Sequence, residues 1–518
     1  MKPVVLTFVF GTFAATLGPQ VHAQSAEPLS AIDWLSQSVE PAKIPTRRLP
    51  TAPAVRDEAP VASGAGTPSV TTTPLDGPSP DPIGLLSSDL TGLPATLWSA
   101  SEEATLIALL QAQQTDGLPA MQDLLKTLLM AEADPPLGAS AAGGLFQARV
   151  DKLLDIGAIE PAQALLEQAG AETPDLFRRW FDVALLTGSE DMACRTLQAR
   201  IDVAPTYAAR IFCLARGGDW NAAALSLNTH RVLGDISEDE EALLSRFLDP
   251  ELYEGEPPLG TPERISPLVF RLYEAIGERM TTNRLPRAFA HADLRNQVGW
   301  KSQLEAAERL ARHGAIAGNV LFALYTSRRP SASGGVWDRA DAIQDFDTAI
   351  RDNDPDAIAA TLPAAWDAMK FVKTEIAFAQ NYGPNLVDVP LEGQAAEVAA
   401  AVGLLSSSYE ATAIARSDGD AFLVALARGV PQGVEANDPL RRAIADAFGE
   451  VSAPDALKDM VDNGQLGEAI LRSIALVDVG MSGDYQTLTE ALSFLRSVGL
   501  EDVARRAGLQ LLLLERPT

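Results

Sequence analysis

Three stretches of the chain share one pattern: LLDIGAIEPAQALL at residues 153–166, ALLTGSEDMACRTL at 184–197 and LARGGDWNAAALSL at 214–227. Each stretch has a glycine at its fifth position, an alanine five residues later and a leucine nine residues later. A glycine that ends one helix, followed by a small residue and then a leucine, predicts the tight turn and second helix of an α-hairpin. Because the pattern returns about every 30 residues, we expect stacked hairpins. The three glycines are Gly157, Gly188 and Gly218.

This spacing resembles that of the tetratricopeptide-type and related α-solenoid families. The resemblance is clearest over residues 150–235, for instance in Gly218-Asp219-Trp220-Asn221-Ala222-Ala223, and weaker over 455–510. It implies an all-α protein, an α-solenoid of antiparallel helical hairpins with right-handed superhelical stacking, that binds other proteins. The resemblance supplies no active-site residue.

The composition favours closely packed helices and excludes several kinds of partner. Apolar residues make up 47% of the chain but aromatic residues only 6%, so the core must be built from alanine and leucine. The net charge of −28 argues against nucleic acid, because phosphates must be neutralised by clustered lysine and arginine. After the N-terminal region, apolar runs are too short for a membrane span, so we expect none in the mature chain.

The first residues have the pattern of a secretory signal peptide. Lys2 precedes an apolar stretch from Val4 to Leu17, and Val21-His22-Ala23 fits cleavage after Ala23. The alternative is a retained membrane anchor, for which this apolar stretch is short. We therefore predict an exported, periplasmic protein whose signal peptide covers residues 1–23.

Five segments are predicted after the signal peptide. They are a short amphipathic helical segment at 24–40, a disordered Pro/Ser/Thr-rich linker at 41–95, a helical-repeat array at 96–249, a second helical sub-array at 263–330 and a C-terminal helical array at 336–518. Proline in the linker forbids helix and central strand alike. A flexible chain of about 40 residues has an average end-to-end distance of roughly 35 Å.

Two cysteines, Cys194 and Cys213, are predicted to form a disulfide. They flank a turn that contains Pro205, and an antiparallel helix pair turning near residue 203 would place them opposite each other. An even cysteine count in an exported protein supports the same pairing. The alternative is two buried free thiols that act as small apolar side chains.

Two groups of residues are candidates for binding a partner. Ile32, Trp34 and Leu35 lie in an apolar segment, Leu29 to Val39, that predicts a tethered docking helix, either for this protein's own helices or for a partner. The alternative is an N-terminal tail with incidental aromatic residues. The second group lies between residues 291 and 309, where tryptophan and arginine are typical interface anchors. Its members are His291, Arg295, Trp300 and Lys301. These residues fit equally an inter-helix salt-bridge network with Trp300 filling the core.

No motif for catalysis, metal or phosphate binding is found in the sequence, so we expect no catalytic residue, no metal and no cofactor. The favoured hypothesis is a non-enzymatic periplasmic scaffold or adaptor that binds a protein partner, for example in a secretion or motility assembly of the envelope. The alternative is a cell-wall polysaccharide-binding protein or enzyme. That alternative requires exposed aromatic residues clustered with carboxylates, whereas the tryptophans are scattered along the sequence.

Overall fold

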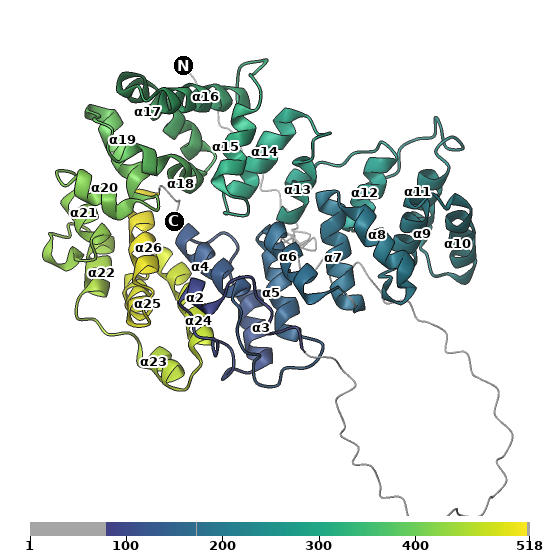
Figure 1. The fold of residues 1–518 in the computed structure, drawn as a ribbon, viewed down its shortest axis with the longest axis horizontal. Helices are drawn as coiled ribbons and strands as arrows, with labels where there is room; N and C mark the ends of the chain where they lie inside the picture. The colour runs from purple at the N-terminus through teal and green to yellow at the C-terminus, as the bar shows by residue number, and fades with distance from the viewer. Residues whose placement is uncertain (1–78, 172, 515–518) are drawn as a thin grey trace, which may run out of the picture.

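The computed structural model describes residues 79–171 and 173–514 (Figure 1). Within these ranges all regular structure is helical, and only two isolated β-bridges, Leu86 with Ala131 and Glu102 with Leu137, occur beside the helices. The predicted all-α class is therefore confirmed for this part of the chain. The predicted signal peptide, the amphipathic segment at 24–40 and linker residues 41–78 lie outside the described residues.

The predicted disorder of residues 41–95 is wrong for residues 79–95, which pack on the helices that follow. Asp81 is fully buried, and its carboxylate accepts a hydrogen bond of 2.7 Å from the backbone N–H of Phe146. The backbone N–H of Leu85 donates to Met130 O at 2.8 Å. The prolines of this stretch indicated a linker. The contacts that anchor it could not be predicted from the local pattern, because both involve chain more than 40 residues away.

The helices form a ring and an arm. A short helix, α2 (Ser88–Thr91), precedes the ring. The first ring helices are α3 (Glu103–Ala112), α4 (Pro119–Met130), α5 (Gly144–Asp155) and α6 (Ile159–Ala169). The arm comprises α7 (Pro174–Thr187), α8 (Glu190–Ala199), α9 (Tyr207–Arg216), α10 (Trp220–Leu233), α11 (Glu238–Leu248) and α12 (Pro267–Ala275). In Figure 1 the arm extends away from the ring, with α10 at its far end.

The ring resumes with helices that follow the arm. A 3-10 turn, η3 (Arg287–Phe289), leads into α13 (Ala290–Asp293), α14 (Trp300–Ala311), α15 (Gly318–Thr326), α16 (Val336–Asp352), α17 (Pro355–Phe371), α18 (Glu375–Leu386) and α19 (Gly393–Leu404). The last helices are α20 (Tyr409–Ala415), α21 (Ala421–Ala427), α22 (Pro439–Phe448), α23 (Asp455–Asp462), α24 (Leu466–Met481), α25 (Tyr485–Ser497) and α26 (Glu501–Leu513).

Glycine ends the first helix of each hairpin that the spacing predicted. Gly157, Gly188 and Gly218 adopt φ angles of 83°, 84° and 85°, which a side chain with a Cβ rarely adopts. The alanines five residues later are fully buried, and the leucines nine residues later are buried as well. Because alanine has only a methyl group, the two helices of a hairpin approach closely at that point.

The disulfide between Cys194 and Cys213 is present, as predicted. It joins α8 to α9 with a Cα–Cα distance of 4.9 Å, and both side chains are buried. The cross-link fixes these two consecutive helices of the arm relative to each other.

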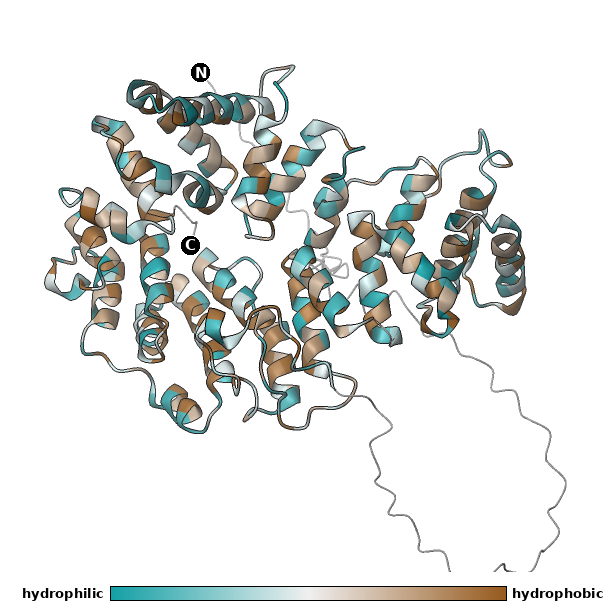
Figure 2. Cartoon of the chain, in the orientation of Figure 1, coloured by the Kyte–Doolittle hydropathy of each residue, from teal (hydrophilic) through white to brown (hydrophobic). Residues whose placement is uncertain are grey.

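The two ends of the helical series pack together and close the ring (Figure 1). Helix α26 contacts α4, and α24 contacts both α3 and α4. Gln510 Oε1 accepts a hydrogen bond of 2.7 Å from Ala120 N, and Gly467 N donates to Leu97 O at 3.1 Å. Apolar residues from Leu93 through the arm to Ala292, together with those from Leu404 onward, share one continuous core, while a second core fills the region from α14 to α19 (residue hydropathy is shown in Figure 2).

Candidate functional site

The predicted patch between residues 291 and 301 lies at the junction of the ring and the arm, and most of it is buried. His291 lies on α13 and its Nε2 is 2.7 Å from Gly157 O. Because a carbonyl oxygen can only accept, the imidazole is the donor in this hydrogen bond. Burial lowers the pKa of His291 to about 4, and the hydrogen bond to Gly157 offsets this only in part. The imidazole is therefore neutral at pH 7 and fastens α13 to the turn between α5 and α6.

Trp300 and Lys301 begin α14 and face opposite environments. Trp300 is buried, donates from Nε1 to Leu324 O at 2.9 Å and packs on Trp337 with 5.2 Å between ring centroids. Lys301 is exposed and lies 3.6 Å from Glu305. The side chains of His291, Arg295 and Trp300 are thus occupied inside the molecule, and Lys301 alone of the four is open to solvent.

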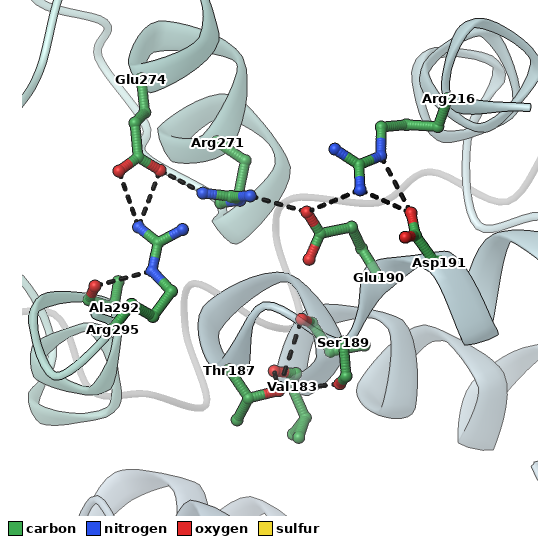
Figure 3. Close-up of polar contacts among 11 residues, drawn as sticks. Val183, Thr187, Ser189, Glu190, Asp191, Arg216, Arg271, Glu274, Ala292 and Arg295 are labelled. Carbon is green, nitrogen blue, oxygen red and sulfur yellow. Dashed lines mark hydrogen bonds and ion pairs between the residues drawn. The ribbon is translucent and has the colours of Figure 1, made fainter. Parts of the chain in front are cut away.

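Arg295 begins a series of alternating charges that crosses from the ring into the arm (Figure 3). Its Nη2 lies 2.7 Å from Glu274 on α12, and Glu274 also pairs with Arg271 on the same helix. Arg271 in turn reaches Glu190 on α8 at 2.6 Å, and Glu190 lies 3.4 Å from Arg216 on α9. We call this series the charge ladder; its last contact joins Arg216 to Asp191.

Glu274 is held ionised within the charge ladder by its two arginine partners. Burial alone would raise the pKa of Glu274, but hydrogen bonds and charge from Arg295 and Arg271 keep that pKa below its usual value. The ladder contains equal numbers of arginines and carboxylates, so its charge is balanced. Its physical effect is to align α8, α9 and α12 with the end of α13.

Asp182 on α7 is the buried carboxyl group best suited to acid–base chemistry. Burial raises its pKa to about 7, against the opposing charges of Arg178 and Arg179, and Oδ2 has no hydrogen-bond partner. It borders a cavity of about 30 Å³ between α7, α9, α11 and α12. The cavity itself therefore holds about one or two water molecules.

A larger cavity of about 310 Å³ lies between α4, α6, the turn before α15 and α18. Most of its charged side chains already have partners. Lys126 Nζ lies 2.8 Å from Asp123 and donates to Gly314 O at 2.8 Å, and His313 lies 3.2 Å from Asp116. These contacts join the first and middle parts of the ring across its interior.

The exposed aromatic residues of the described chain lie on separate helices. Trp220 is on α10, Phe371 ends α17 and Tyr485 begins α25, whereas Trp180, Trp300 and Trp366 are buried. Sugar-binding sites use aromatic faces gathered beside polar groups, as the polysaccharide alternative required. The described residues show no such gathering.

Helix α10 carries an apolar face that the rest of the described chain leaves uncovered. Leu225, Val232 and Leu233 are 69%, 81% and 65% exposed. With the exposed Thr229 they occupy positions i, i+4, i+7 and i+8, which lie together on one side of a helix. We call these four residues the outer face of α10. The opposite side holds the helix to α9 and the hairpin through the buried Ala223 and Leu227.

Acidic residues border the outer face of α10 at its C-terminal end. Residues 235–256 contain nine carboxylates and one arginine, a net charge of −8. Ser237 caps α11 in a capping box with Glu240, as its sequence pattern indicates, and this places Glu238 and Asp239 in an exposed first turn. His230 and Arg231 each pair with one of the carboxylates, Asp235 and Glu241 respectively. Glu256 pairs with Arg246, and five further carboxylates, Glu238, Asp239, Asp249, Glu251 and Glu254, are exposed.

This surface was not identified from the sequence, although a signal for it exists. Residues 220–233 contain two apolar stripes, one at 223 and 227 and another at 225, 232 and 233. A helix that is apolar on two sides is normally covered on both. The N-terminal candidates Ile32, Trp34 and Leu35 lie outside the described residues.

Searches for similar proteins and for metal or membrane sites add no further assignment. No family model, no curated protein and no solved structure matches this chain. Among the described residues no group of three or more His, Cys, Asp or Glu side chains is placed to hold a metal ion. Over the same residues no helix is long and apolar enough to cross a membrane.

Proposed function

We propose that this protein is a non-enzymatic helical scaffold or adaptor that binds a protein partner through the outer face of α10. The observation that carries the proposal is the exposure of Leu225, Val232 and Leu233 on one side of a helix at the end of the arm. Apolar side chains of this size each contribute about 1.5–3 kcal/mol when they are buried. Such a gain is available only if another surface covers them.

The charge around this face defines the chemistry of the partner. An apolar helix face beside a strongly acidic segment favours an amphipathic helix that carries basic residues. The charge ladder and the disulfide support the same role, since they give the arm a fixed shape from which α10 is presented. A rigid surface binds with a smaller loss of conformational entropy than a mobile one.

An exported, periplasmic location is part of this proposal. A disulfide is compatible with an oxidising compartment, because cytosolic thiols are normally kept reduced. An assembly of the bacterial envelope, such as a secretion or motility machine, is the setting that we favour for the partner. The α-solenoid resemblance of the hairpins is consistent with a role in protein binding.

The test is affinity capture from a periplasmic extract with the full mature chain. Leu225→Glu combined with Val232→Glu should abolish capture of the specific partner, because two carboxylates replace the apolar contact beside an already acidic segment. Ile414→Glu is the matched control, since Ile414 is 70% exposed on α20, away from the arm. A partner retained equally by both variants, or one without an amphipathic basic segment, would contradict the proposal.

A further inference from the structure

The outer face of α10 matches a segment of this chain that lies outside the described residues. Ile32, Leu35 and Val39 recur at i, i+3 and i+7, the spacing of one helix face. After Glu40, residues 41–48 contain three basic residues, Lys43, Arg47 and Arg48, and no carboxylate, a net charge of +3. We infer that residues 29–48 occupy the outer face of α10 in the same molecule until a partner displaces them.

The order of the two features fixes the direction of the segment. On the arm, the apolar residues 225–233 precede the acidic residues 235–241 at the C-terminal end of α10, where Asp235 and Glu241 contact His230 and Arg231, and in the segment the apolar residues precede the basic ones. A segment that runs parallel to α10 therefore pairs apolar with apolar and basic with acidic positions. Residues 29–39 would span about 15 Å as a helix, and residues 225–233 span about 12 Å.

The connecting chain is long enough for this docking. Thirty residues, 49–78, join the segment to Ser79, where the described chain begins. In an extended polyproline-like form they reach about 90 Å. A compact body of this length is about 60 Å across, so a reach of about 90 Å leaves a margin for the arm that carries α10 away from the ring (Figure 1).

Tethering makes even weak docking effective. A flexible link of this kind gives an effective concentration on the order of 1 mM. A segment that binds as a free peptide with a Kd of about 100 μM would then cover the face for about nine-tenths of the time. This inference rests on the proposed function in one respect. Both use the outer face of α10, so a partner must compete with the segment for that face.

The decisive experiment maps the contact in the intact mature chain. Thr229→Cys places one thiol in the centre of the outer face, and it is the only reactive thiol because the two native cysteines are paired. After labelling with a benzophenone maleimide and irradiation, we expect intramolecular cross-links to residues 29–48. Cross-links only between two chains would assign the face to a second copy, and cross-links that avoid residues 29–48 would also overturn the inference.

A second measurement tests whether the apolar and charged contacts both matter. Trypsin should cut after Lys43 and Arg47 at least five-fold more slowly in the wild type than in Leu225→Glu/Val232→Glu, with Ile414→Glu behaving as wild type. Cleavage after Arg56 serves as the internal control, because it lies beyond the docked segment. Protection should fall as salt is raised from 50 to 500 mM, since opposite charges are then screened. Equal cleavage rates in all three proteins would refute docking.

These outcomes separate the inference from the proposed function. Replacing Ile32, Trp34 and Leu35 by alanine should release the face and increase partner capture at least five-fold. If α10 protects residues 29–48 from trypsin but no partner is captured from the extract, the inference is supported and the proposed function is not. If capture depends on α10 but residues 29–48 are not protected, the proposed function is supported and the inference is not.

Discussion

Closure of the ring can be tested at Gly467, where the first residues of α24 meet the segment before α3. A Cβ atom on Gly467 would lie 2.4 Å from Cζ3 of Trp98 and 2.7 Å from Leu97 O. Trp98 is buried and the Leu97 oxygen belongs to the backbone, so neither can move aside easily. Gly467→Ala should therefore open this contact at a cost of about 1–3 kcal/mol, the usual range for an overpacked core.

The assay for this prediction is hydrogen exchange, which reports local opening. A cost of about 1–3 kcal/mol corresponds to exchange roughly 5- to 150-fold faster for backbone amides of residues 97–101 and 465–470. Gly433→Ala is the matched control, because nothing lies within 4 Å of a Cβ atom at Gly433 and its φ is not positive. Unchanged exchange in Gly467→Ala would refute the reasoning that this glycine is required for the ends to meet.

Three further predictions concern the arm and its junction. Replacing Cys194 and Cys213 by serine should lower the free energy of unfolding by about 3 kcal/mol, measured by urea denaturation, because the loop between them is no longer closed. Burial raises the pKa of Asp182 to about 7, so the folded state keeps a proton that the unfolded state releases, and stability falls as pH rises from about 4 to 7. Asp182→Asn should remove this loss, up to about 4 kcal/mol, and a constant difference from wild type across that range would contradict it. Burial lowers the pKa of His291 to about 4, so stability is lost as the pH falls from 6.5 through 4. This loss is up to about 3 kcal/mol, and His291→Gln should reduce it. Urea midpoints that follow the wild-type pH profile would contradict the assignment of His291.

Local features of the fold could be predicted because short sequence patterns determine them. Gly157, Gly188 and Gly218 each impose a left-handed turn, and the capping box at Ser237 begins α11 where its pattern places it. Other turns have no such local signal. The chain turns between α17 and α18 at Lys373, which has a φ of 57° although it is not a glycine.

Long-range contacts could not be predicted from local sequence patterns. The buried carboxylate of Asp81 depends on a backbone N–H of α5, and ring closure depends on contacts such as that of Gln510 with Ala120, 390 residues away. For His291, Arg295 and Trp300 the sequence leaves two explanations, partner binding or a salt-bridge network with a core tryptophan, and the contacts in the structure are those of the second. The residue types alone could not show whether these side chains face solvent or the interior of the protein.

Ring closure constrains how the length of this protein can change during evolution. An open stack of hairpins gains or loses a unit freely, because each unit contacts only its neighbours. Here α26 must meet α4, so a hairpin added to or removed from the ring would separate the two surfaces. The arm is inserted between α6 and α13, and contacts such as that of His291 with Gly157 hold its two ends together. Natural variants of this chain should therefore differ in length within the arm, while the number of ring helices stays constant.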